Sequence, residues 1–289
     1  MSGARVGHRD ESHYSYTVYA DRGMAERFDR ARFSGPIGTL IAEAQERVLF
    51  EFLGDVRGQA IVDVGTGTGR AALAMAARGA TVRGIDASAE MLAVARRRAD
   101  QAGLDIEFTT GDAHALALPD GSVDAAVSLR VLMHTPGWDQ CLAELCRVSR
   151  HRVIVDYPAA RSLALLQSLA RRAGLARDRE AYRVFSGRTI RRAFAERGFR
   201  VTRVHRQFVL PIAVHKAIGS RAFTRASEGL LRGVGLLRLF GSPVTVLAER
   251  TPHVTHVARG TSHVAPRTSH VAPRTSHVAP RTSHVAPRT

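Results

Sequence analysis

The glycine-rich turn at residues 65–69 limits the fold more than any other feature of the sequence. Residues 62–70 read VDVGTGTGR, so an apolar run enters the turn and an alanine-rich run leaves it. Glycine lets the backbone take positive φ and approach a ligand closely. The N–H groups at the start of the following helix then face a polar ligand. The pattern therefore predicts a strand, a ligand-binding turn and a helix in succession.

The spacing of these glycines excludes the usual dinucleotide fingerprint. That fingerprint requires G-x-G-x-x-G, but the sixth position counted from Gly65 is Arg70. The sequence instead has G-x-G-x-G, with Asp63 two residues before the first glycine. The residues that follow must decide which nucleotide-like ligand the turn suits.

Short apolar, β-branched segments alternate with helical segments on both sides of this turn. We expect five strands at 60–64, 81–85, 106–109, 123–129 and 152–156, and two further strands at 199–209 and 243–248. Helices are expected at 70–78, at 88–101, from Thr135–Pro136 onward, at 161–173 and at 188–197. Single helices between strands imply right-handed parallel crossovers. The prediction is an α/β fold with a Rossmann-like, doubly wound, mostly parallel seven-stranded sheet.

Three regions are expected along the chain. Residues 1–54 are predicted to form an N-terminal helical lid, with Tyr14, Tyr16, Tyr19 and Phe33 as candidate lid or pocket residues. Residues 55–250 are expected to form the ligand-binding domain. Residues 251–289 carry TSHVAPR repeats, and the proline in each repeat disfavours a helix. This low-complexity tail is predicted to be disordered.

Net charge and hydropathy narrow the possible partners. The formal net charge of +16 attracts nucleic acid or anionic membranes. However, Lys216 is the only lysine, so the charge also fits a coding bias toward arginine. The polar N-terminus and the lack of a long apolar run predict a cytoplasmic protein with no stable membrane insertion. Cys141 and Cys146 match no metal pattern, and we expect reduced thiols and no metal site.

Acidic residues follow the second and third expected strands. Asp86 and Ala87 end the second strand, 21 residues after the first glycine of the turn. An acid there can accept hydrogen bonds from both ribose hydroxyls of an adenosine, although Asp86 can also cap the helix that begins near Ser88. Asp112 and Ala113 follow the third strand in the segment TGDA.

Together these motifs resemble class I S-adenosylmethionine-dependent methyltransferases, and the type 11 methyltransferase-like family in particular, over residues 59–157. The resemblance implies S-adenosyl-L-methionine as cofactor. It places Asp112 near the adenine amino group, and Asp63 either near the methionine moiety or as a support of the glycine turn. The implied cofactor-binding residues are Asp63, Gly65, Thr66, Gly67, Gly69, Asp86, Ala87, Asp112, Ala113 and Ser128.

His134 follows the fourth expected strand and is the candidate general base. Histidine can exchange a proton at neutral pH, but a base is needed only if the acceptor loses a proton at or before transfer. Histidine is also common at this position in the resembling family without an assignable catalytic role. A packing or cofactor-shaping role is therefore an open alternative, and no catalytic residue is assigned. Arg130, also after this strand, has two interpretations, a ligand contact or a surface arginine.

The apolar and basic segment at residues 208–240 also has two interpretations. It contains Leu230, Leu231, Val234, Leu237 and Leu239, interleaved with Arg232 and Arg238. The segment can form a helical cover on the sheet edge, which is the favoured interpretation. It can alternatively form the wall of an apolar acceptor site or a membrane-surface contact.

The leading functional hypothesis is methyl transfer to a small metabolite, apolar or aromatic in character. One alternative is a nucleic-acid methyltransferase, suggested only by the positive charge. A second is a protein that binds S-adenosylmethionine without catalysis. The acceptor atom and the oligomeric state stay open at this stage.

Overall fold

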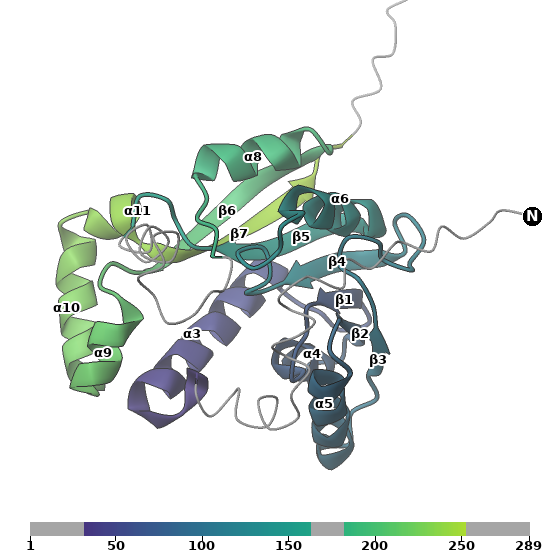
Figure 1. The fold of residues 1–289 in the computed structure, drawn as a ribbon, viewed down its shortest axis with the longest axis horizontal. Helices are drawn as coiled ribbons and strands as arrows, with labels where there is room; N and C mark the ends of the chain where they lie inside the picture. The colour runs from purple at the N-terminus through teal and green to yellow at the C-terminus, as the bar shows by residue number, and fades with distance from the viewer. Residues whose placement is uncertain (1–31, 163–181, 253–289) are drawn as a thin grey trace, which may run out of the picture. The chain divides into compact units, whose positions relative to one another are not determined.

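A seven-stranded sheet organises the chain, with strand order β3-β2-β1-β4-β5-β7-β6 (Figure 1). The computed structural model describes residues 32–162 and 182–252. Neighbouring strands from β3 to β5 pair in parallel, and β7 is antiparallel to both β5 and β6. The strands are β1 Ala60–Val64, β2 Thr81–Asp86, β3 Glu107–Thr110, β4 Val123–Ser128, β5 Ser149–Tyr157, β6 Phe199–Phe208 and β7 Ser242–Arg250. The predicted mostly parallel, Rossmann-like sheet is confirmed.

Helices cover both faces of this sheet. They are α3 Gly35–Leu53, α4 Arg70–Ala76, α5 Ala89–Ala102, α6 Trp138–Val148, α8 Gly187–Ala195, α9 Ile212–Ile218, α10 Arg221–Gly233 and α11 Leu236–Phe240. Along β1, Ile61 packs with α3, α4 and α5, whereas Val62 and Val64 pack with α6 and α8. This alternation follows from the pleat of a strand buried on both faces.

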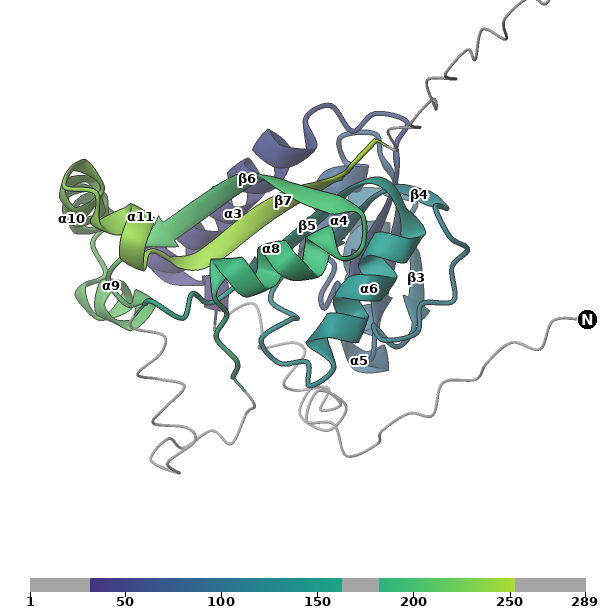
Figure 2. The same cartoon turned by 90° about the horizontal axis from the view of Figure 1, so that it is seen from above.

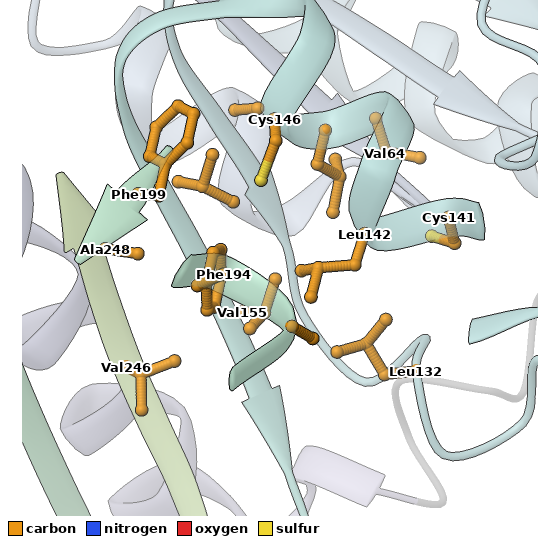
Figure 3. Close-up of a cluster of buried hydrophobic side chains, with 14 of the residues drawn as sticks. Val64, Leu132, Cys141, Leu142, Cys146, Val155, Phe194, Phe199, Val246 and Ala248 are labelled. Carbon is orange, nitrogen blue, oxygen red and sulfur yellow. The ribbon is translucent and has the colours of Figure 1, made fainter. Parts of the chain in front are cut away.

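The core between the sheet and helices α6 and α8 contains both cysteines (Figure 3). Cys141 and Cys146 are buried among leucine, valine and phenylalanine side chains and form no disulfide. Burial raises the pKa of each thiol to about 12. Both cysteines are therefore neutral core residues at physiological pH.

The start of α6 differs from the sequence-based expectation. The helix begins at Trp138 after Gly137, not at Thr135–Pro136. The Thr135 hydroxyl donates to the Val131 carbonyl oxygen at 2.9 Å. The hydroxyl is committed to a turn after β4, in which the His134 N–H also donates to Val131. Thr135 therefore does not cap α6.

Helices α9, α10 and α11 form a group that we call the helical lobe, residues 212–240. Figures 1 and 2 show these helices together at the end of the sheet where β6 ends and β7 begins. Ile212 packs against a small cluster of Ile37 and Ile41 from α3 and Phe208 from β6. Within the lobe, the buried His215 ring contacts Glu228 at 3.0 Å and Thr224 at 3.1 Å.

Some sequence-based expectations lie outside the described residues. These are the first 31 residues of the lid with Tyr14, Tyr16 and Tyr19, a helix expected at 161–173 apart from its first two residues, and the tail from residue 253 onward. Among the described helices, none combines the length and the apolar character needed to cross a bilayer.

Candidate functional site

A cavity opens at the carboxyl ends of β1, β2 and β4, where a doubly wound sheet is expected to bind its ligand. The turn after β1 forms one wall, and the segments after β2, β3 and β4 form others. Residues Arg32, Phe33 and Gln45, before and within α3, complete the lining. The cavity has an empty volume of about 1220 Å³, its open part included. The topology thus brings together segments that are separated by up to a hundred residues in sequence.

The three glycines of the turn have different surroundings. All have positive φ, +72° at Gly65, +56° at Gly67 and +78° at Gly69. A Cβ on Gly65 would lie 2.2 Å from Val131 Cγ2, and one on Gly69 would lie 2.8 Å from Leu73 Cδ1. A Cβ on Gly67 would meet no atom within 4 Å. Gly65 and Gly69 therefore allow close packing, whereas Gly67 leaves open space beside the cavity.

Asp86 joins the glycine turn to the start of α5. The Gly67 N–H donates to Asp86 Oδ2 at 2.7 Å, and the Ser88 N–H donates to Oδ1 at 2.9 Å. Ser88 itself caps the helix, because its Oγ accepts from the Met91 N–H. Burial raises the pKa of Asp86. Each carboxylate oxygen can still accept another hydrogen bond, so Asp86 can hold the loop and also face a ligand hydroxyl.

The buried Asp63 carboxylate supports the glycine turn through a hydrogen bond with Thr66. Its side chain is only 2% exposed, and the Thr66 hydroxyl donates to Oδ2 at 2.7 Å. Burial raises the pKa of Asp63 to about 6, and the nearby Asp86 carboxylate acts in the same direction. This geometry accounts for the loop-supporting role that the sequence left open. Contact with a methionine moiety stays a prediction.

Asp112 forms a compact turn with His114, a residue that the sequence did not indicate. Asp112 Oδ1 accepts from the His114 N–H at 2.9 Å and lies 2.7 Å from His114 Nδ1. The Gly111 N–H donates to the Asp86 carbonyl oxygen, which ties this turn to the end of β2. Asp112, Ala113 and His114 all line the cavity. The spacing of Asp112 and His114 could have indicated this turn, because an aspartate side chain commonly accepts a hydrogen bond from the backbone N–H two residues ahead.

Eight of the ten predicted cofactor residues line the cavity, and two do not. Ser128 is fully buried, and its hydroxyl donates to the Val64 carbonyl oxygen at 2.8 Å, which joins β4 to β1. Gly69 lies behind the turn, next to Leu73. A cofactor contact of either residue has no geometric support. The eight that line the cavity are Asp63, Gly65, Thr66, Gly67, Asp86, Ala87, Asp112 and Ala113.

Arg130 lines the cavity, and the buried Asp156 carboxylate holds its backbone. Arg130 is the one non-glycine residue within 32–162 and 182–252 with positive φ, at +66°. Its N–H donates to Asp156 Oδ1, and Asp156 is buried at the end of β5. Burial raises the pKa of Asp156, while the Arg130 and Arg32 guanidinium groups oppose that effect. Arg130 thus lines the cavity in a backbone conformation that costs energy for arginine.

His134 lies at the cavity in a mostly buried position. Its side chain is 7% exposed, and its ring meets Tyr182 edge-on with centroids 6.1 Å apart. The turn after β4 fixes its backbone through the bond to Val131. The ring therefore both packs and faces the cavity, and this placement leaves its two interpretations open.

At the rim of the cavity, Phe33 meets Arg70. The Arg70 guanidinium lies 4.0 Å from the centroid of the Phe33 ring, a distance that fits a cation–π contact. An Arg70 nitrogen also donates to Gln45 Oε1 at 2.6 Å. The predicted pocket residue Phe33 therefore does line the cavity. Arg70 and Gln45 carried no sequence signal of such a position.

Comparison with known proteins agrees with this geometry. Residues 61–152 match the family model described as a methyltransferase domain. A demethylmenaquinone methyltransferase from Thermus thermophilus is 39% identical over 103 residues, which cover 34% of this chain and 47% of that protein. The chain thus spans about half the length of that curated relative. The family-model match covers the part of the chain that carries the glycine turn and the acidic residues after it.

Solved structures share the fold over a longer stretch. The magnesium protoporphyrin IX methyltransferase from Synechocystis PCC 6803 with bound SAH has a TM-score of 0.58 at 20% identity, covering 81% of this chain and 96% of that chain. The cyclase SpnF has a TM-score of 0.52 at 21% identity, covering 72% and 80%. Both have the fold of class I S-adenosylmethionine-dependent methyltransferases, and this chain has it too.

Proposed function

We propose that this chain, which carries a class I S-adenosylmethionine-dependent methyltransferase domain at residues 61–152, transfers a methyl group to a small organic acceptor. The observation that carries the proposal is the cavity beside Gly67, where the main chain leaves open space and Asp86 and Asp112 present carboxylates. An adenosine needs hydrogen-bond acceptors for its ribose hydroxyls and its adenine amino group. The donor and acceptor set of this cavity fits that need.

The proposed cofactor, when bound, supplies an electrophilic methyl group on sulfur. The residues of this chain then have only to bind and orient the two reactants. We assign ribose binding to Asp86 and adenine recognition to the turn at Asp112 and Ala113. Asp63 and Thr66 would hold the glycine turn in shape. Gly69 and Ser128 would act only through packing and strand pairing, since neither lines the cavity.

We further propose that the acceptor is small and apolar or aromatic. Phe33, Leu129 and Val131 contribute apolar lining beyond the glycine turn. The relatives named above act on demethylmenaquinone and magnesium protoporphyrin IX according to their names, and both acceptors have large apolar parts. The fold alone does not carry the reaction, because the cyclase SpnF shares it. The cytoplasmic location, the domain limits and the disordered tail stay predictions.

Transfer of label from methyl-labelled S-adenosylmethionine to a cell extract tests the proposal. The extract is separated after incubation into an organic phase, a nucleic-acid fraction and a protein fraction. Label in the organic phase or in soluble metabolites would support a small acceptor. Label confined to nuclease-sensitive material would favour the nucleic-acid alternative. Cofactor binding without label in any fraction would favour the non-catalytic alternative.

A further inference from the structure

Exposed large apolar side chains concentrate on the helical lobe. Leu230 is 70% exposed, Val234 65% and Leu239 54%. Of the described residues, the other exposed large apolar ones are Val204 on β6 and Val214, Ile218, Phe223 and Phe240 in the lobe. Seven of these eight described residues thus lie in the lobe, and such a concentration of exposed apolar side chains is typical of an interaction surface. The favoured interpretation of residues 208–240, a cover on the sheet edge, therefore explains only the buried part of the lobe, such as Leu237.

Helix α10 turns its apolar stripe outward. Phe223 and Leu230 are seven residues apart, so they lie along one side of the helix, and Val234 follows at its C-cap. All three are exposed. The opposite side carries Arg225 and Arg232, which line a cavity that α10 shares with α3 and β6. A helix that only covered the sheet would have the reverse orientation.

Polar contacts hold α10 in this orientation. Arg221 forms an ion pair with Glu43 of α3. The Glu228 carboxylate accepts from the Val209 N–H at 2.9 Å and the Leu210 N–H at 3.0 Å, in addition to contacting His215. The outward apolar stripe is therefore a fixed feature of the fold and not a loosely packed end.

The exposed charges of the lobe are all positive. Its cations are Lys216, Arg221, Arg225, Arg232 and Arg238, and its one acid is the buried Glu228. Within residues 32–162 and 182–252, no carboxylate lies within ion-pair distance of Arg225, Arg232 or Arg238. An apolar stripe on a lobe whose exposed charges are all positive suits a lipid surface with anionic headgroups.

We propose that the helical lobe docks on an anionic lipid surface. Leu230, Val234 and Leu239 enter the interface between headgroups and acyl chains, and Arg238, next to Leu239, contacts the headgroup phosphates. The arginines on the opposite side of α10 add to the positive potential of the lobe. No part of this docking requires a membrane-spanning helix. Charge complementarity favours the lipid surface over a second copy of this chain, because the lobe of that copy would bring like charges together.

The lobe adjoins the cavity rim. Phe33 lines the cavity and packs on the cluster of Ile37, Ile41 and Phe208 that also holds Ile212 at the start of α9. The Lys216 ammonium donates to the Arg32 carbonyl oxygen at 3.0 Å, and Arg32 lines the cavity as well. Docking thus brings the cavity rim near the lipid, which would suit an acceptor dissolved there; this consequence alone rests on the proposed function.

Vesicle co-flotation of the full chain, without cofactor, tests the docking. Vesicles of phosphatidylcholine and phosphatidylglycerol in equal molar amounts are compared with pure phosphatidylcholine vesicles. We expect at least about tenfold stronger partitioning onto the anionic vesicles. The double variant Leu230→Ser/Val234→Ser keeps every charge and should lose about tenfold or more of that partitioning. Val204→Ser on β6 is the matched control and should change it less than about twofold.

The charges of the lobe are tested separately. Arg225→Gln/Arg238→Gln should weaken anionic-vesicle binding by about tenfold. Arg188→Gln/Arg200→Gln, on α8 and at the start of β6, removes the same charge elsewhere and should have a smaller effect. Equal losses in the two charge variants would show that net charge alone attracts the protein, and would overturn the proposal.

Three other results would overturn it too. One is wild-type protein that stays off the anionic vesicles. A second is a Leu230→Ser/Val234→Ser variant that floats like wild type. A third is a wild-type dimer in sedimentation velocity that this variant converts to a monomer, since the stripe would then bind a second copy. Because flotation needs no turnover, its failure is distinguishable from failure of the methyl-transfer proposal.

Discussion

The Gly67 N–H donates a 2.7 Å hydrogen bond to Asp86 Oδ2, so the glycine turn after β1 is held by the acid that ends β2. The same carboxylate accepts from the Ser88 N–H at the start of α5. Parallel pairing of β1 with β2 brings these groups together, with Val64 opposite Ile85. One side chain thus fixes the shape of the turn and presents acceptor oxygens to the cavity.

Replacing Asp86 should separate these two roles. We expect Asp86→Ala to weaken S-adenosylmethionine binding by about 1.5–3 kcal/mol, the scale of lost hydrogen bonds to a charged group. Asp86→Asn keeps one acceptor oxygen for the Gly67 N–H and should lose less. Titration calorimetry on both variants measures the difference. If Asp86→Ala binds as tightly as wild type, the residue supports only the turn and the helix.

Asp63 should make stability fall as pH rises through mildly acidic values. Burial raises its folded-state pKa to about 6 from an ordinary value of 3.8. Between about pH 3.8 and pH 6, Asp63 is therefore protonated in the native state and ionised in the unfolded state. The free energy of unfolding falls as pH rises across that window. By the scale of about 1.4 kcal/mol per pKa unit, the loss approaches about 3 kcal/mol. Asp86 and Asp156 act in the same direction because burial raises their pKa values also.

Asp63→Asn should flatten that decline. Urea denaturation at several pH values from 4 to 7 measures the free energy of unfolding of the variant and of wild type. Across this range we expect wild type to lose about 1–3 kcal/mol more of that free energy than the variant. The asparagine oxygen can still accept from the Thr66 hydroxyl, which keeps the turn in place. A pH slope unchanged by the substitution would mean that Asp63 titrates near its ordinary pKa in the folded protein.

His134→Ala should behave as the loss of a packing residue. The ring is mostly buried and meets Tyr182 edge-on, so its removal leaves a gap beside the cavity. We expect a lower melting temperature or weaker cofactor binding, with only a modest change in kcat at saturation. A general base typically contributes 10²–10⁴-fold. A drop in kcat beyond about a hundredfold with cofactor affinity intact, measured once the acceptor is identified, would instead make His134 that base.

The sequence predicted the sheet well because its strands carry local signals. The β-branched run at β1 and the glycine turn after it mark one strand end, and the Ser88 cap and Gly103 mark the limits of α5. Long-range contacts carry no such signal. The hydrogen bond between Gly67 and Asp86 depends on strand pairing, and the direction of the Ser128 hydroxyl depends on the pleat of β4. Ser128 was therefore assigned to the cofactor although it bonds to Val64.

The orientation of the helical lobe also depends on long-range contacts that carry no local sequence signal. A helical cover was the favoured interpretation of residues 208–240, but the sequence did not indicate which side of α10 would face outward. That choice depends on the ion pair from Arg221 to Glu43 and on the partners of Glu228, which come from α3 and the end of β6. Asp156 likewise looked like an ordinary strand end, and only the fold places it beside Arg130.

The most direct test of the account is whether open space at Gly67 is needed for the cofactor. Gly67→Val and Gly121→Val make a matched pair, because both glycines have φ +56° and thus equal backbone strain for valine. Gly67 lines the cavity, whereas a Cβ on Gly121 would make only an ordinary 3.6 Å contact with Arg150 Cγ, outside the residues that line it. Calorimetric titration with S-adenosylhomocysteine should give saturable binding to wild type and Gly121→Val, and none to folded Gly67→Val. Equal affinity in all three proteins, or none in wild type, would contradict the account.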